Sequence, residues 1–149
     1  MPTLYLVRHG ETDFNVEGRL QGRFETSLNA RGRRQATACA GVLRDLFGRD
    51  GKAAADFSYV SSPLKRARET MELVRAGLGL DAQGYAVDAR LAEISYGDWE
   101  GRTLAEIGAA DPAVLALRDR DKWDFAPPRS EEHTSDSSHS IASRMPSSA

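Results

Sequence analysis

The sequence predicts an α/β fold in which a mainly parallel sheet is covered by helices. Two short runs of β-favouring residues, Thr3–Val7 and Phe57–Ser61, predict strands, and Tyr85–Val87 predicts a weaker one. Helical patterns follow the first two runs, and strands that alternate with helices usually pair in parallel through right-handed crossovers. Because ligands of such sheets bind beyond the carboxyl ends of the strands, we expect the polar residues after Val7 and Ser61 to converge on one site.

Two amphipathic helices account for most of the expected core. The first begins at Ala30 and ends near Gly48 or Gly51, and its apolar residues recur with a 3.6-residue period: Ala36, Cys39, Ala40, Leu43, Leu46 and Phe47. The second is expected to use Ser62 as its N-cap and Pro63 as its first helical residue. Its apolar stripe is Leu64, Ala67, Met71, Val74 and Leu78. Cys39 lies within the first stripe, which favours a core residue over a reactive thiol.

Two shorter helices are expected later in the chain. A capping box, Thr103 with Glu106, opens the first, and Asp111-Pro112 opens the second, which runs to about Arg120. Residues 10–30 are polar and glycine-rich and predict a long loop.

The composition excludes several classes of protein. The length of 149 residues suits one domain. The formal net charge of -2 argues against a nucleic-acid partner. It has no run of 18 apolar residues and no recognisable signal peptide, so we expect no membrane span and a cytoplasmic location. One cysteine and three histidines exclude a disulfide framework and a Cys-based zinc site. We expect no metal and no cofactor.

The last segment differs in composition from the rest of the chain. Residues 129–149 contain eight serines, whereas residues 1–128 contain five. Such a segment buries too little surface to repay its ordering entropy, and we expect it to be disordered. It is either a natural serine-rich extension or, as we favour, a segment foreign to a domain formed by residues 1–128.

The triplet Arg8-His9-Gly10 directly follows the first predicted strand. A guanidinium group beside an imidazole disfavours its protonation, and a neutral imidazole is a nucleophile. Arginine also matches the geometry of phosphate oxygens, and Gly10 permits a close approach of other backbone. The triplet therefore suits attack on a phosphoryl group.

A second arginine, Arg66, lies at about the fourth position of the helix that begins after Ser62. The N–H groups and dipole at a helix N-terminus favour an anion, to which Arg66 would add its charge. Taken alone, Lys65, Arg66 and Arg68 are more typical of a solvated helix face. Beside Arg8-His9, an anion-binding role is favoured.

These residues form part of a wider resemblance. The segment Leu6–Thr12 with Asn15 resembles the signature of the histidine phosphatase superfamily, the phosphoglycerate-mutase-like proteins. Further blocks resemble later family segments in the same order: Gly18–Gly22, Leu28–Gly32 with Gln35-Ala36, Ser61–Ala67, Leu91–Glu93, Tyr96-Gly97 and Trp99–Gly101. The resemblance implies a three-layer sandwich, and it covers residues 3–128.

The resemblance also implies roles for individual residues. His9 would become phosphohistidine, while Arg8 and Arg66 would hold the phosphoryl oxygens. Asn15, Gln21 and Gly22 would line the phosphate or substrate pocket, and Glu93 would protonate the leaving oxygen. Glu11 and Glu100 are rival acids, of which Glu11 suits a structural partner for nearby arginines. The implied function is phosphomonoester hydrolysis of a small phosphorylated substrate.

The chain departs from the family pattern after Pro128. The family has a second active-site histidine, usually followed by glycine on another strand of the sheet, and neither His133 nor His139 fits that description. We therefore expect an incomplete sandwich whose C-terminal strand and helices are missing, with an exposed apolar face, poor solubility and little turnover. The alternatives to a phosphatase are a phosphoglycerate mutase, or an inactive fragment that binds phosphorylated ligands.

Overall fold

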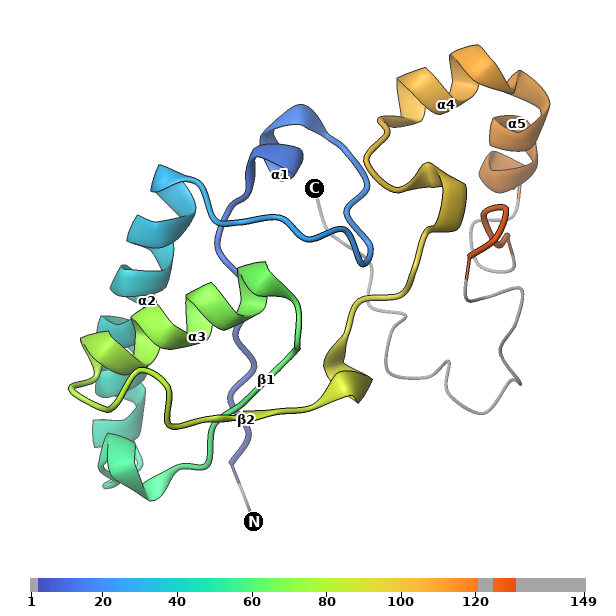
Figure 1. Cartoon of the computed structure of the whole chain (residues 1–149). Helices are drawn as coiled ribbons and strands as arrows, with labels where there is room; N and C mark the ends of the chain where they lie inside the picture. Colours follow the sequence, from blue (N-terminus) through green and yellow to red (C-terminus); the bar gives the residue numbers. More distant parts are fainter. Residues whose placement is uncertain (1–2, 121–124, 131–149) are drawn as a thin grey trace. The chain divides into compact units, whose positions relative to one another are not determined.

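The computed structural model describes residues 3–120 and 125–130, which form two compact units (Figure 1). The first unit comprises the described residues up to Asp13 together with Glu25–Ala92. The second comprises Phe14–Phe24 and the described residues from Glu93 onward. Each unit has its own buried side chains and its own set of candidate functional residues.

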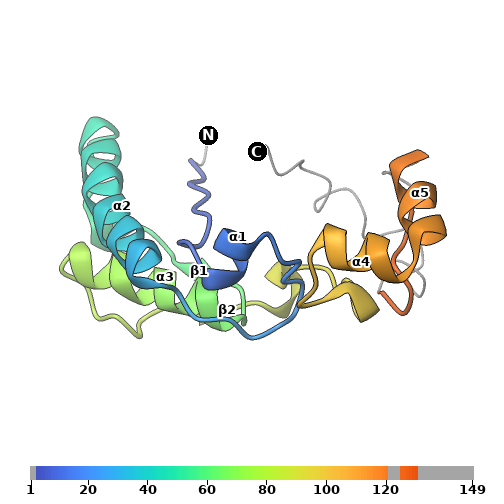
Figure 2. The ribbon, with the colours of Figure 1, turned by 90° about the horizontal axis from the view of Figure 1, so that it is seen from above.

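Two helices that pack side by side dominate the first unit. Helix α2 spans Ala30–Arg49 and α3 spans Lys65–Gly77, and they lie against each other along their lengths (Figures 1 and 2). They lie close together at Gly77, where an added Cβ would lie 2.6 Å from the Cβ of Ala40. Both helices were predicted from their apolar periodicity, and this prediction is confirmed.

The core of the first unit is an apolar and aromatic cluster around Leu43, Phe47 and Val74. The rings of Phe47 and Phe57 stack with their centroids 4.1 Å apart, and Tyr5 meets the Phe47 ring edge-on at 5.2 Å. The leucine, phenylalanine and valine come from the predicted helical stripes, which confirms that these stripes face inward. Cys39 is half-buried against the same cluster, as expected for a core residue.

The sheet of the described residues has two short strands. Strand β1 (Val60–Ser61) pairs in parallel with β2 (Ala86–Val87), in the register Val60 with Ala86 and Ser61 with Val87. Two 3₁₀ helices flank these strands, η1 (Ala54–Asp56) before β1 and η2 (Ala89–Leu91) after β2. Strand β1 precedes α3 in the sequence and β2 follows it, so their parallel pairing is the expected α/β arrangement in an incomplete form.

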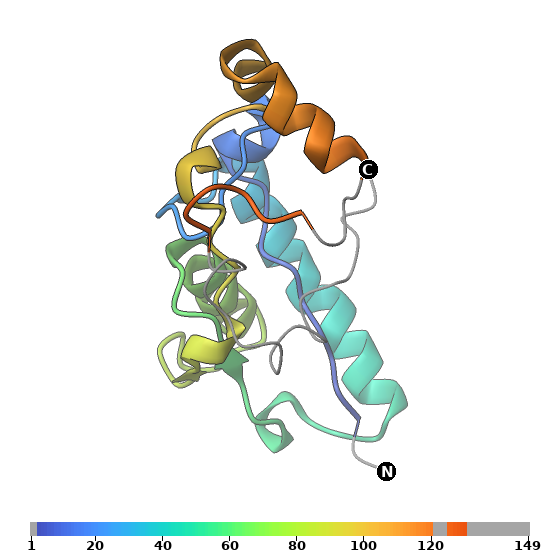
Figure 3. The same ribbon diagram turned by 90° about the vertical axis from the view of Figure 1, so that its right-hand side faces the viewer.

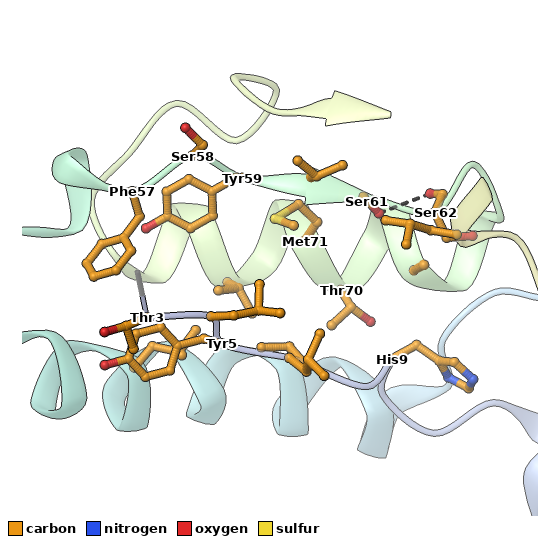
Figure 4. A pocket seen from close by; sticks show the side chains of 18 of the residues that line it. Thr3, Tyr5, His9, Phe57, Ser58, Tyr59, Ser61, Ser62, Thr70 and Met71 are labelled. Atoms are coloured by element: carbon orange, nitrogen blue, oxygen red, sulfur yellow. Dashed lines mark hydrogen bonds between the residues drawn. The ribbon is translucent and has the colours of Figure 1, made fainter. Parts of the chain in front are cut away.

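The predicted strand over Thr3–Val7 is wrong, because this segment joins no ladder in the described residues. Tyr5 packs against the core cluster, whereas Leu4, Leu6 and Val7 are 80%, 81% and 44% exposed. A cavity of about 360 Å³ separates the segment from β1, although both run in the same direction (Figures 3 and 4). Among the residues that the structure describes, no neighbouring strand pairs with the segment, and a ladder requires one. The exposed apolar side chains agree with the expected uncovered face.

The second unit contains short helices that are fixed by capping and by one arginine. Its helices are α1 (Asp13–Glu17), the 3₁₀ helix η3 (Gly97–Trp99), α4 (Leu104–Ala110) and α5 (Pro112–Arg120). The predicted capping box of Thr103 and Glu106 is present at the start of α4, and α5 begins and ends as expected. Helix α1 lies in the region that was expected to be loop. The Arg19 guanidinium donates to Gly101 O and Glu106 Oε2, each at 2.8 Å.

The serine-rich segment begins with two described residues. Arg129 forms an ion pair with Asp98, and Ser130 is 2% exposed within the second unit. Residues 131–149, where disorder and a foreign origin were predicted, lie outside the described residues, as do His133 and His139. Within the described ranges, no helix is long and apolar enough to cross a membrane.

Candidate active site

The His9 imidazole is half-buried at the end of the Thr3–Val7 segment, on the same side as Ser61 and Ser62 at the end of β1 (Figure 4). The two predicted strand ends therefore do converge. His9 Nδ1 lies 2.7 Å from Gly10 O. A carbonyl oxygen only accepts hydrogen bonds, so Nδ1 carries the proton and Nε2 carries the lone pair of the neutral ring.

The environment of His9 favours this neutral form. Burial lowers the pKa of the imidazole from its ordinary value of 6.5, and the positive charges of Arg66 and Arg8 lower it further. The hydrogen bond to Gly10 acts in the opposite direction but does not outweigh burial. Both arginines that the sequence singled out therefore act electrostatically on the predicted nucleophile.

The backbone beside His9 is locked between α2 and α3. Gly10 N–H donates to Thr70 Oγ1 at 3.0 Å, and Glu11 N–H donates to Gln35 Oε1 at 2.9 Å. Gly10 also lies against the backbone of Gly32, because a Cβ at Gly10 would meet Gly32 O at 2.3 Å. The expectation that Gly10 permits a close backbone approach is correct, and the backbone concerned is the first turn of α2.

The two arginines differ in their exposure. Arg66 is only 3% exposed and is the second residue of α3, whereas Arg8 is exposed beside His9. A guanidinium group held in a buried position keeps its planar fork of donors in one orientation. This burial excludes the alternative that Arg66 belongs to a solvated helix face, and its role in binding a phosphoryl group stays a prediction.

The start of α3 differs from the prediction. The N-cap is Leu64 rather than Ser62, and the helix begins at Lys65 rather than Pro63. Ser62 Oγ accepts from Leu64 N–H at 3.3 Å, while Glu25 Oε2 accepts from Lys65 N–H at 2.9 Å. Because Pro63 supplies no N–H, the hydrogen bonds at this turn come from the two N–H groups after it, which donate to the side chains of Ser62 and Glu25. The Glu25 carboxylate therefore already binds one of the backbone N–H groups that we expected to bind an anionic ligand.

Glu11, one of the rival acids, has a structural role. Its Oε1 accepts from Asn29 Nδ2 at 3.0 Å, and its Oε2 lies 3.4 Å from Arg31 Nη1. Its backbone carbonyl accepts from Asn29 N–H at 2.9 Å. The predicted pairing of Glu11 with a nearby arginine is confirmed, and it fastens the segment after His9 to the N-terminus of α2.

The remaining predicted site residues belong to the second unit: Asn15, Gln21, Gly22 and Glu93. Asn15 is exposed, Gln21 is 9% exposed, and Gly22 adopts a φ of 50° that favours glycine. The Glu93 side chain is exposed, and its Oε1 accepts from Ile94 N–H at 3.2 Å. The predicted site residues therefore divide into two sets. Arg8, His9 and Arg66 lie in the first unit, and the second unit holds the set that includes the proposed acid, Glu93.

Glu100, the other rival acid, organises the second group. Its Oε1 accepts from Arg23 N–H, Ser95 Oγ and Tyr96 N–H, each at 3.0 Å. Gly22 lies against the same carboxylate, because a Cβ there would meet Oε1 at 2.3 Å. An oxygen with three donors ties two loops together and is poorly placed to deliver a proton.

Sequence reasoning missed the residues that hold His9 in place. Thr70 could have been found from its spacing, because it follows Arg66 by four residues and so lies one turn along the same helix face. Gly32 and Gln35 lie in a block of the family resemblance but were given no role. No cluster of three or more potential metal ligands occurs within the described residues.

Comparison with known proteins places this geometry in context. Residues 4–145 match the family model described as histidine phosphatase superfamily (branch 1), a range that extends into the serine-rich segment. Glucosyl-3-phosphoglycerate phosphatase of Mycobacterium tuberculosis is 42% identical over 121 residues, covering 80% of this chain and 49% of that protein. A probable phosphoglycerate mutase of Cronobacter sakazakii is 36% identical over 104 residues, covering 70% of this chain and 43% of that protein.

A solved structure agrees with these similarities. The mycobacterial glucosyl-3-phosphoglycerate phosphatase in complex with VO3 matches with a TM-score of 0.61 at 39% identity, covering 80% of this chain and 53% of that one. The chain thus spans about half the length of the curated relatives it matches.

Proposed function

Since the chain belongs to the histidine phosphatase superfamily, we propose that it is a phosphomonoester hydrolase that works through a phosphohistidine intermediate on His9. The observation that carries this proposal is the neutral imidazole of His9. Its Nδ1 proton is held by Gly10 O, its Nε2 carries the lone pair, and the charges of Arg66 and Arg8 lower its pKa.

The proposed reaction has two steps. His9 Nε2 attacks phosphorus, so that an N–P bond forms while the bond between phosphorus and the alcohol oxygen breaks. Water then attacks phosphorus while Glu93, which gave its proton to the alcohol, takes a proton from the water; the N–P bond breaks, which releases inorganic phosphate and restores the neutral ring. The guanidinium groups of Arg8 and Arg66 hold the non-bridging oxygens, and phosphoryl transfer depends mainly on such positioning and charge stabilisation.

Arg66→Lys tests the arginine fork. The buried guanidinium can hold two oxygens at once, whereas an ammonium is a point charge, so we expect phosphoryl transfer to fall by about a hundredfold. Initial rates with an aryl phosphate measure the loss. A variant with the rate of the unmodified chain would remove Arg66 from the site.

The family resemblance supports Glu93 as the acid that protonates the leaving oxygen, with Asn15, Gln21 and Gly22 contributing to substrate binding. Glu93→Gln gives a direct test, because a poor leaving group needs a proton whereas a nitrophenolate does not. We expect the variant to be slowed about a hundredfold or more with an alkyl phosphate and far less with a nitrophenyl phosphate. Equal losses with both substrates would argue against the acid role.

The proposed substrate is a small phosphorylated metabolite, and we place the protein in the cytoplasm, with no nucleic-acid or membrane partner. A small substrate is consistent with relatives named for phosphorylated small molecules. The name of one relative supports the alternative of a phosphoglycerate mutase. A further alternative, an inactive fragment that binds phosphorylated ligands, follows from the short coverage of the relatives.

One pair of assays separates these functions. The chain is incubated with a radiolabelled aryl phosphate, and acid-labile label on the protein is measured together with released inorganic phosphate. Label that is lost in His9→Ala, together with phosphate release, supports the hydrolase. Interconversion of 2- and 3-phosphoglycerate without net phosphate release supports the mutase, and binding without label supports the inactive fragment.

A further inference from the structure

Thr70 is a buried polar residue to which the proposed reaction gives no role. It lies on α3, one helical turn after Arg66, and is 4% exposed. Its Oγ1 donates to Arg66 O at 2.8 Å and accepts from Gly10 N–H at 3.0 Å. The hydroxyl therefore joins the turn of helix that carries Arg66 to the backbone beside His9. Figure 4 shows the Thr70 side chain on the side of α3 that faces the segment leading to His9.

This contact matters because glycine does not fix its own conformation. Gly10 must be glycine, since a Cβ would lie 2.3 Å from Gly32 O, yet glycine has the greatest backbone freedom of any residue. Its carbonyl is the group that accepts the proton of His9 Nδ1. The orientation of this carbonyl must therefore be imposed by bonds from other residues.

Two side chains hold the peptides on either side of the Gly10 Cα, and the carbonyl orientation depends on both, because the carbonyl peptide can turn about the Gly10 Cα unless the peptide before it is also held. Thr70 holds the peptide between His9 and Gly10 through its N–H, and Gln35 holds the next peptide through the N–H of Glu11. A peptide is planar and trans, so fixing the N–H of Glu11 also fixes Gly10 O on the opposite side. Of the two clamps, only Thr70 is buried and reaches the arginine helix.

We propose that Thr70 is a positioning residue that holds the Gly10 backbone so that His9 keeps its proton on Nδ1 and presents Nε2 beside Arg66. This inference rests on the proposed function for its catalytic consequence. Its structural consequence, the tautomer of His9, exists whether or not the protein turns over substrate.

The chain supplies a matched control for the test. Thr37 on α2 donates its hydroxyl to Arg33 O at 3.0 Å, which is the same bond to the fourth preceding residue that Thr70 makes. Thr37 is exposed, and its side chain makes this bond within α2 without contacting the backbone beside His9, so it serves as the control. Replacing either threonine by the isosteric valine removes the helix bond, but only Thr70→Val also removes the acceptor of Gly10 N–H.

The experiment compares the full chain with Thr70→Val, Thr70→Ser and Thr37→Val. Long-range proton–nitrogen NMR reports the His9 tautomer, and acid-labile labelling by a radiolabelled aryl phosphate reports phosphohistidine formation. We expect Thr70→Val to lose the preference for the Nδ1 proton and to be labelled roughly tenfold to a hundredfold more slowly, with little change in the concentration dependence. Thr70→Ser, which keeps the hydroxyl, and Thr37→Val should behave as the unmodified chain.

The outcomes are distinguishable from failure of the proposed function. An unmodified chain that shows the Nδ1 tautomer but takes no label would count against the phosphatase and not against the role of Thr70. A normal His9 tautomer in folded Thr70→Val would overturn the role of Thr70. If Thr70→Val does not fold, hydrogen exchange in the unmodified chain decides: a protected Gly10 amide supports the proposal, and a rapidly exchanging one overturns it.

Discussion

Two glycines of α2 should respond in opposite directions to the same substitution. In Gly32→Ala the new Cβ would lie 2.1 Å from Glu11 O and 2.7 Å from Glu11 N, whereas in Gly41→Ala it would meet nothing within 4 Å. Ordinary contact begins near 3.4 Å, so the Glu11 backbone must retreat by about 1 Å or more in the first variant. Glu11 follows Gly10 directly, so this displacement reaches the carbonyl that orients His9.

The expected sizes follow from these contacts. Crowding of this kind costs about 1–3 kcal/mol of unfolding free energy, and a misplacement of about 1 Å in a site costs on the order of a hundredfold in rate. Gly41→Ala should instead stabilise the helix by about 0.5–1 kcal/mol and leave the rate unchanged, because alanine is the better helix former.

Denaturant unfolding and the initial rate of acid-labile labelling, measured on both variants, check these expectations. Gly32→Ala with the stability and labelling rate of the unmodified chain would refute the claim that the first turn of α2 sets the His9 backbone. A loss in Gly41→Ala as large as that in Gly32→Ala would show that the loss does not come from the contact with Glu11, and the contact argument would fail.

Three further changes test other parts of the structure. Because burial and the nearby arginines lower the pKa of His9 below 6.5, the neutral ring predominates at pH 6.5 and the labelling rate should fall with a midpoint below that pH; an NMR titration of His9 checks this. Phe47→Ala, which removes a ring stacked on Phe57, should lower the unfolding free energy by about 3–5 kcal/mol in denaturant titrations. Replacing the exposed Leu4 and Leu6 by lysine should reduce aggregation in light scattering without lowering stability.

The helices could be predicted from the sequence because their information is local. The α2 stripe repeats every 3.6 residues, and the Thr103–Glu106 capping box is written in four consecutive residues. A strand depends on a neighbour that can lie anywhere in the chain. Thr3–Val7 has the composition of a strand, yet in the described residues it has no ladder partner.

The start of α3 illustrates the same limit within the site. Ser62-Pro63 is a good local signal for a helix N-terminus, and Ser62 does accept a backbone N–H from Leu64. The carboxylate of Glu25, 40 residues earlier in the chain, takes the next N–H, and no local pattern indicates it. The helix therefore begins at Lys65, and Arg66 occupies its second position rather than about its fourth.

The proposed nucleophile, His9, is held by parts of the chain that all belong to one compact unit. His9 ends one segment, Gly32 and Gln35 on α2 fix the peptides after it, and Thr70 on α3 fixes the peptide before. Arg66 is bound into the same helix turn as Thr70. Each of these contacts joins residues of the first unit. The sequence could identify the imidazole and both arginines because their chemistry is distinctive, whereas Gly32, Gln35 and Thr70 act only through backbone geometry that the fold creates.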